Sequence, residues 1–121
     1  MTNDDRENER IDEEKEETLL LTMKSGPTYE QVVDVVAQFY GVSKTSILRA
    51  KKKGRMPFYE KMTIYLTHRM TTLSLAELER VFGRKLRTII KAFQDVEALS
   101  KDNGEMKKMM QEIVWEINRE N

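Results

Sequence analysis

The stretch LSLAELERVFGRKLRTIIKAF, residues 73–93, decides the fold because it predicts two short helices joined by a tight turn. Ser74 is a favoured N-cap residue, and Glu77 three positions later completes a capping box. The apolar residues that follow recur at helical spacing: Leu75, Leu78 and Phe82. Gly83 then stands where a helix commonly ends in a left-handed residue. The first half of the stretch therefore predicts a capped helix that stops at Gly83.

A second periodic run begins almost at once and predicts the other helix of the pair. One face is apolar and is expected to point inward: Leu86, Ile89, Ile90 and Phe93. The opposite face is mainly basic: Arg84, Arg87, Thr88 and Lys91. A capped helix, a glycine turn and a helix with a basic outer face are typical of a helix-turn-helix, which places its second helix in the major groove of DNA. We therefore predict a helix-turn-helix at about residues 74–100.

The zero net charge of the chain conceals three blocks of different sign. Residues 1–43 carry four basic and eleven acidic side chains, for a net −7. Residues 44–91 carry thirteen basic and three acidic ones, for +10, and residues 92–121 carry four and seven, for −3. The predicted helix-turn-helix lies in the only basic block, and binding to phosphates depends on such local charge. The charge pattern therefore favours a nucleic-acid partner.

Composition excludes several other classes of protein. A chain of 121 residues has room for one modest domain and a tail. It contains no cysteine for a disulfide or thiolate metal site, and no apolar run long enough to span a membrane. His68 is the only histidine and is expected to have a structural or surface role. We expect a cytoplasmic, nucleoid-associated protein without cofactor, metal or enzymatic activity.

The chain divides near residue 26. Residues 1–26 form a predicted disordered, acidic tail, and Gly26 and Pro27 break the chain at its end. Residues 27–121 form the predicted helical DNA-binding domain. One interpretation of the tail is a solubilising spacer; the alternative is a segment that folds back on the basic block and competes with DNA.

The predicted domain is an all-α bundle of about six helices with short loops. Thr28 and Gln31 form a capping box for the first helix, which ends at Gly41. Its expected apolar face comprises Val32, Val33, Val35, Val36, Phe39 and Tyr40. Ser43 caps a short second helix with Ile47 and Leu48 pointing inward, and Pro57 fits the first turn of a third helix. The third helix has the apolar stripe Phe58, Met62, Tyr65, Leu66 and Met70.

Asn103 is expected to cap a final helix with the apolar stripe Met106, Met109, Met110, Ile113 and Ile117. Trp115 and the methionines of this helix are interpreted mainly as core. The minority interpretation is a homodimer that forms through helical surfaces including this C-terminal helix, because methionine-rich faces suit adaptable contacts.

Residues from about Thr28 to Ile117 resemble the C-terminal DNA-binding domain, domain IV, of the bacterial replication initiator DnaA, in the Trp-repressor-like group. The segment from Val36 to Tyr40 followed by Ile47 and Leu48 looks like the opening helices of that family. The lysine- and arginine-rich loop resembles its basic loop. Further matches fall on its Ser-Leu, Glu and Phe-Gly positions and on parts of its Gly-Gly-Arg-Asp-His-Thr-Thr-Val motif: Ser74, Leu75, Glu77, Phe82, Gly83, Arg84, Thr88 and Ile89.

The resemblance implies that the basic loop reaches the minor groove and that the helix after Gly83 enters the major groove. Two features depart from the family. Lys85 and Leu86 replace the Asp-His pair that reads bases, so we expect a different DNA sequence to be recognised. The chain also contains no G-x-x-x-x-G-K-[ST] phosphate loop, so we expect a bacterial DNA-binding module used alone.

The expected DNA-binding residues come from the basic loop and the helix-turn-helix: Lys51, Lys52, Lys53, Arg55, Ser74, Arg84, Lys85, Arg87, Thr88 and Lys91. The function predicted from them is sequence-dependent binding of double-stranded DNA by a transcriptional regulator. The alternatives are a nucleoid-associated or replication-modulating DNA-binding protein and, from another class, a protein–protein adaptor with a helical scaffold.

Overall fold

The computed structural model describes residues 26–48 and 55–119, and the regular structure in these two ranges is entirely α-helical. The predicted tail up to residue 25, and Lys51, Lys52 and Lys53 of the predicted loop, lie outside the described residues. The six helices of these two ranges are α2 (Tyr29–Tyr40), α3 (Lys44–Leu48), α4 (Phe58–Met70), α5 (Leu75–Phe82), α6 (Leu86–Asp102) and α7 (Gly104–Arg119). The all-α prediction of about six helices is confirmed.

The ends of α2 and α5 follow the same local rules. In α2 the Gln31 amide donates to Thr28 Oγ1 at 3.2 Å, and the Thr28 amide donates to Gln31 Oε1 at 2.9 Å. Ser74 and Glu77 form the equivalent pair of bonds at the start of α5, at 3.2 and 3.1 Å. Both helices end at a glycine in the left-handed conformation, Gly41 with φ 66° and Gly83 with φ 62°. Both predicted capping boxes and both glycine stops are confirmed.

Three further helix starts were predicted and lie within one residue of their expected positions. The Ser46 amide donates to Ser43 Oγ at 3.0 Å, next to the start of α3. The Met106 amide donates to Asn103 Oδ1 at 3.1 Å, so Asn103 caps α7 as predicted. Pro57 lies at the N-cap position of α4, immediately before the first turn. Its extended ψ of 151° explains the one-residue difference, because the helix can begin only after it.

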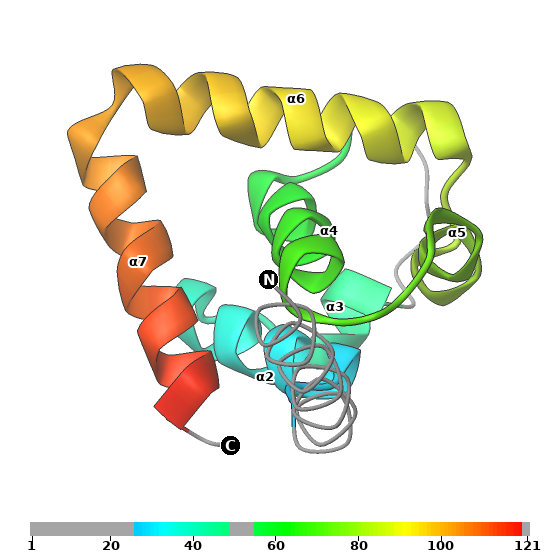
Figure 1. Cartoon of the computed structure of the whole chain (residues 1–121), viewed down its shortest axis with the longest axis horizontal. Coiled ribbons are helices and arrows are strands. Elements are labelled where there is room, and N and C mark those ends of the chain that lie inside the picture. Colours follow the sequence, from blue (N-terminus) through cyan, green and yellow to red (C-terminus); the bar gives the residue numbers. More distant parts are fainter. Residues whose placement is uncertain (1–25, 49–54, 120–121) are drawn as a thin grey trace, which may run out of the picture.

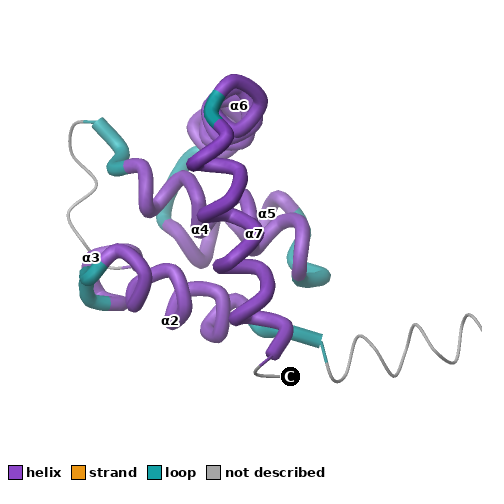
Figure 2. Tube along the Cα trace, turned by 90° about the vertical axis from the view of Figure 1, so that its left-hand side faces the viewer, coloured by secondary structure: helices purple, strands orange, loops and turns teal. Residues whose placement is uncertain are grey.

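Helix α4 lies at the centre of the molecule, between α6 above and α2 and α3 below (Figures 1 and 2). Its most extensive contacts are with α6 and α2, and it is buried on nearly every side between Met62 and Thr67. Two polar side chains, Thr63 and Thr67, are therefore fully buried beside the apolar stripe. The predicted apolar stripe describes one buried side of α4. The burial of the opposite side was not predicted, because it results from the central position of α4 among the other helices.

The core joins side chains from every described helix. Its fully buried apolar members include four valines of α2 and residues from each later helix: Val32, Val33, Val35, Val36, Ile47, Met62, Ile64, Leu78, Phe82, Ile89, Val96, Ile113 and Ile117. The methionines of α7 (Met106, Met109 and Met110) pack against this core as predicted.

Several apolar side chains expected inside are exposed. Leu86 and Ile90 of α6 are exposed, because α6 rests on the core along the narrow strip Ile89, Ala92 and Val96. Leu75, at the start of α5, is also exposed. Phe39 is 41% exposed near the end of α2, and Trp115 is 62% exposed on α7. The interpretation of Trp115 as core is therefore wrong, since the core of this small bundle covers only one side of α7.

Candidate nucleic-acid interface

Helices α5 and α6 meet at a turn built from Gly83, Arg84 and Lys85. The Arg84 amide donates to the Glu79 carbonyl at 3.3 Å across the left-handed Gly83, which closes the end of α5. Phe82 before the turn and Ile89 after it are fully buried in the common core. Local hydrogen bonding and core packing therefore fix the start of α6 relative to α5, as a helix-turn-helix requires.

A buried ion pair attaches this turn to the central helix. Arg84 Nε donates to Glu60 Oε2 at 2.8 Å, and Nη2 donates to Glu60 Oε1 at 3.0 Å. The two side chains are only 11% and 2% exposed. Such bidentate geometry is the strongest form of an arginine–carboxylate contact. Arg84 was expected on the outer face of the second helix; instead, its guanidinium points back to α4 and positions the turn.

The exposed basic side chains lie along the first turns of α6. Lys85 occupies the N-cap and is exposed, and Arg87 is exposed one turn before Lys91. The side chain of Lys91 is 74% exposed, and Thr88 between them is half-buried. The first turn of α6 contains no acidic residue. This end of α6 therefore combines a helix N-terminus with side chains that can donate hydrogen bonds to phosphates and base edges.

The described end of the predicted basic loop lies next to this helix. Arg55 and its neighbour Met56 line a hollow of about 280 Å³ together with Lys61 of α4 and four residues of α6: Thr88, Lys91, Ala92 and Asp95. Sequence reasoning placed Arg55 and Lys91 in one basic block, and the fold brings them to one surface. Ser74 is exposed at the start of α5, where its hydroxyl is engaged in the capping box.

One carboxylate at the edge of this surface is held by lysines. Lys61 Nζ donates to Asp95 Oδ2 at 2.8 Å, and Lys91 Nζ lies 4.0 Å from Asp95 Oδ1. The hydrogen bond from Lys61, with the charges of Lys61 and Lys91, lowers the pKa of Asp95 below its ordinary 3.8. Asp95 is therefore ionised near neutral pH and fixes α6 to α4 beside the basic face.

Aromatic side chains also fix α6 to α4; Tyr65 and Phe93 were expected to face inward, but their contact with each other and with His68 was not predicted. The His68 ring stacks on Phe93 with centroids 4.7 Å apart, and Tyr65 meets Phe93 edge-on at 6.3 Å. The Arg69 guanidinium lies 5.5 Å above the Tyr65 ring. The expected structural or surface role of His68 agrees with this exposed, stacked position. The spacing of Tyr65 and His68 on one helical face was the only available signal.

Together the capped helix, the left-handed glycine turn and the basic start of α6 define a helix-turn-helix DNA-binding domain. Among residues 26–48 and 55–119, no helix is long and apolar enough to cross a membrane. The same part of the chain holds no group of three or more histidine or carboxylate side chains suited to a metal ion.

Comparison with known proteins gives the family of this domain. Residues 29–96 match the family described as the bacterial dnaA protein helix-turn-helix. The chromosomal replication initiator protein DnaA of Aquifex aeolicus is 33% identical over 81 residues, which cover 66% of this chain and 20% of that protein. The chain therefore belongs to the family of bacterial DnaA helix-turn-helix domains, as the resemblance predicted. It spans about a fifth of the length of this relative.

Proposed function

We propose that the chain binds double-stranded DNA with a preference for particular sequences and acts as a transcriptional regulator. The first turns of α6 enter the major groove, and the loop that ends at Arg55 holds the adjacent backbone or minor groove. The matched family is a helix-turn-helix, and regulation by occupying a promoter needs no activity beyond DNA binding.

The observation that carries the proposal is the position of Arg87 and Lys91. Both are exposed on the outer side of α6, one turn apart, while Ile89 between them is buried. Arginine and lysine on a recognition helix donate to guanine edges or to phosphates. Helix α6, which carries Arg87 and Lys91, is fixed in place by the buried Glu60–Arg84 pair and by the Lys61–Asp95 pair. A helix fixed before binding lowers the entropic cost of binding DNA.

The two side chains that depart from the family motif support recognition of a different sequence. Lys85 is exposed at the N-cap of α6, where an ammonium group can only donate hydrogen bonds. Leu86 is exposed rather than buried, so its methyl groups can contact the methyl group of thymine. Lys85 and Leu86 therefore offer a hydrogen-bond donor and an apolar contact at the two positions where the family motif has Asp and His.

Selection of bound sequences from a random duplex pool tests the proposal. A regulator is expected to bind one selected sequence about 10³-fold or more tightly than bulk DNA. Arg87→Ala is expected to weaken binding to that sequence about tenfold or more and to relax the preference at one base pair. Lys91→Ala is expected to reduce the salt dependence of binding, because a phosphate contact releases counterions.

Lys101→Ala is the matched control, because Lys101 is an exposed lysine at the far end of the same helix. Its affinity should equal that of the unaltered chain. Binding that persists at full strength in a variant lacking both Arg87 and Lys91 would sink the recognition-helix assignment and favour the protein–protein adaptor.

A replication-modulating or nucleoid-associated role is the second candidate. The name of the Aquifex aeolicus relative, a chromosomal replication initiator, favours the first of these. Equal affinity for selected and bulk duplexes would favour an architectural role over regulation. Preferential occupancy of replication origins over promoters in cells would favour the replication-modulating role.

A further inference from the structure

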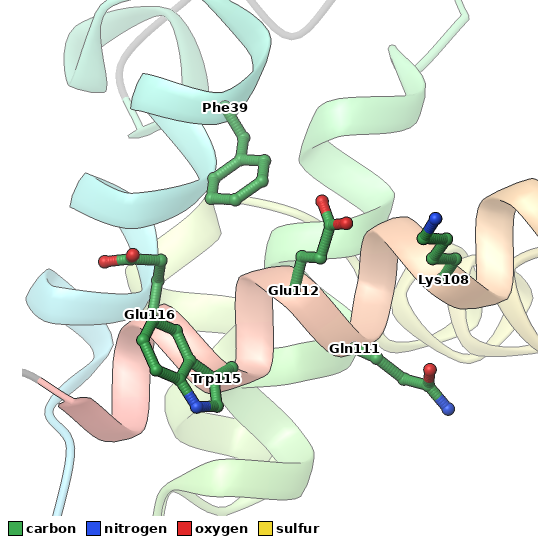
Figure 3. Close-up of a pocket in the computed structure, with 6 residues that line it drawn as sticks. All are labelled: Phe39, Lys108, Gln111, Glu112, Trp115 and Glu116. Carbon is green, nitrogen blue, oxygen red and sulfur yellow. The ribbon is translucent and has the colours of Figure 1, made fainter.

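A second surface, made by α2 and α7, has no part in the DNA-binding surface described above. It carries the two large side chains that the core leaves exposed on these helices, Phe39 at 41% and Trp115 at 62%. They border a hollow of about 500 Å³ together with polar side chains of α7: Lys108, Gln111, Glu112 and Glu116 (Figure 3).

Trp115 stands on the side of α7 that faces away from the core. Ile113 and Ile117 mark the core side, and a helix turns about 100° per residue, so Trp115 points about 180° from the midpoint of these two. The hollow extends along the same helix from Trp115 and Glu116 to Gln111 and Glu112 one turn earlier, and to Lys108 two turns earlier. One face of α7 thus carries a protruding ring and, beside it, a cavity bordered by Phe39.

The indole is held in place on this face. Arg119 Nη2 donates to Glu116 Oε2 at 2.9 Å, and the Arg119 guanidinium lies 5.2 Å above the Trp115 ring. A large aromatic side chain that is oriented in advance and left exposed is typical of the anchor residues of protein interfaces.

We propose that a second copy of this chain covers the surface. The two α7 helices run antiparallel around a two-fold axis at the level of Glu112, and Trp115 of each copy enters the hollow of the other. A two-fold interface requires a surface complementary to itself. A protrusion and a hollow side by side on one helix meet that requirement.

The charges of α7 fit the same arrangement. Lys108 and Glu116 stand four residues before and after Glu112 on the side of the helix that borders Phe39, so Lys108 meets Glu116 of the second copy. Glu105 and Arg119 stand seven residues before and after Glu112 and meet in the same way. Glu112 faces Glu112 of the second copy, which makes one like-charged pair against four opposite pairs.

The interface leaves the DNA-binding surface open. The start of α6 lies beside α5, and α7 lies at the other end of the molecule (Figure 1). A dimer through α7 therefore presents two uncovered helix-turn-helix units to two half-sites. The binding of two half-sites rests on the proposed function. The dimer interface does not depend on that function, so it is tested without DNA.

Sedimentation and tryptophan fluorescence of the full chain test the proposal. Trp115 is the only tryptophan, so its emission reports on this surface alone. The expected result is a dimer whose fraction rises with concentration, together with a blue shift of emission. Trp115→Ala should sediment as a monomer at concentrations where the unaltered chain is dimeric. Leu99→Ala, which removes an exposed leucine from α6, is the matched control and should dimerise normally.

Charge exchange identifies the occupant as a second copy. Lys108→Glu and Glu116→Lys should each weaken dimerisation about tenfold, and the double variant should recover most of the loss, because the exchanged charges meet again across the axis. Glu112→Gln should strengthen the dimer by removing the like-charged pair.

Three results would overturn the proposal. The first is a chain that stays monomeric up to about 1 mM, the weak end of specific association. The second is a dimer that survives Trp115→Ala. The third is a double charge variant that dimerises as weakly as its single variants. Only a second copy of the chain carries both exchanged charges, so only a symmetric dimer can regain its affinity in the double variant.

Discussion

Helices α2 and α5 begin and end in the same way but serve different purposes. Each has a hydroxyl N-cap, a capping box and a left-handed glycine at its end. Helix α2 buries five side chains and forms a base of the core, whereas α5 buries only Leu78 and Phe82 and leads into the recognition helix. Local sequence therefore sets where both helices start and stop, and it does not set what they do.

The residues after the two glycines show where the difference arises. Lys44, three residues after Gly41, pairs with Asp34 at 3.2 Å, and these side chains are 61% and 34% exposed. Arg84, directly after Gly83, makes its bidentate pair with Glu60 in the interior. An exposed pair adds little, whereas a buried pair fixes the turn because either partner alone is costly to bury. The helix-turn-helix is rigid because its turn is attached to α4.

The largest expected effect is the loss of the buried pair. Arg84→Ala removes the guanidinium that donates two hydrogen bonds to the buried Glu60 carboxylate and should cost about 3–5 kcal/mol of folding free energy. Lys44→Ala, the matched change after Gly41, should cost about 0–1 kcal/mol because its pair is exposed. Chemical denaturation of both variants measures the two costs.

A double variant sharpens this first prediction. Glu60→Leu combined with Arg84→Met should recover most of the stability, because an apolar pair of similar volume needs no charge compensation. Equal losses for Arg84→Ala and Lys44→Ala would show that the turn of α5 and α6 is not anchored by the buried pair.

The glycine turns should give a smaller effect on stability and a clear difference in DNA binding. Gly41→Ala and Gly83→Ala each place a side chain at positive φ, with nothing within 4 Å of the added Cβ, so backbone strain alone should cost roughly 1–2 kcal/mol in both. Only Gly83→Ala should also weaken DNA binding, since Gly83 sets the angle at which α6 leaves α5. Thermal unfolding and duplex titration separate the two effects; a matching loss of affinity in Gly41→Ala would contradict the comparison.

The smallest expected effect distinguishes the capping boxes by pH. The third residue of the box is Gln31 in α2 and Glu77 in α5. Hydrogen bonds from the backbone and hydroxyl of Ser74 lower the pKa of Glu77 below its ordinary 4.5. The stability that the ionised Glu77 gives to the start of α5 is therefore present above pH 4.5 and is lost as the pH falls through the lowered pKa of Glu77. In an NMR titration, the Ser74 amide, which donates to Glu77 Oε1, should shift as this carboxylate is protonated, whereas the Thr28 amide donates to Gln31, which has no charge to lose. Glu77→Gln should remove the Ser74 response.

The parts of the structure that were predictable from sequence are those set by neighbours along the chain. The caps Thr28, Ser74 and Asn103 and the stops Gly41 and Gly83 depend on hydrogen bonds over three or four residues and on backbone conformation. The exposure of Arg87 and Lys91 followed from helical periodicity. Sequence patterns placed Arg55 and Lys91 in the same basic block but did not predict that they lie close together. The sequence between residues 49 and 57 carries no signal of which helix it would approach.

What sequence patterns missed depends on partners far along the chain. Arg84 belongs to the exposed basic face by pattern, and only the location of Glu60, 24 residues earlier, turns it inward. Leu86 and Ile90 fit an apolar stripe and Trp115 was interpreted as core, but a small bundle has too little core to cover every apolar side chain of a helix. Helical periodicity predicts which side of its own helix a side chain points to. It does not predict which other segment of the folded chain packs against that side.

By itself the sequence determined the helices, their ends and the basic start of α6, because each rests on interactions within one or two helical turns. Only the tertiary structure decided that α4 is central, that Arg84 anchors the turn, and that Phe39 and Trp115 share an uncovered surface. The physical reason is that burial and ion pairing depend on which segments the folded chain brings together. The same helical code can thus produce a supporting helix at α2 and the first helix of a DNA-binding motif at α5.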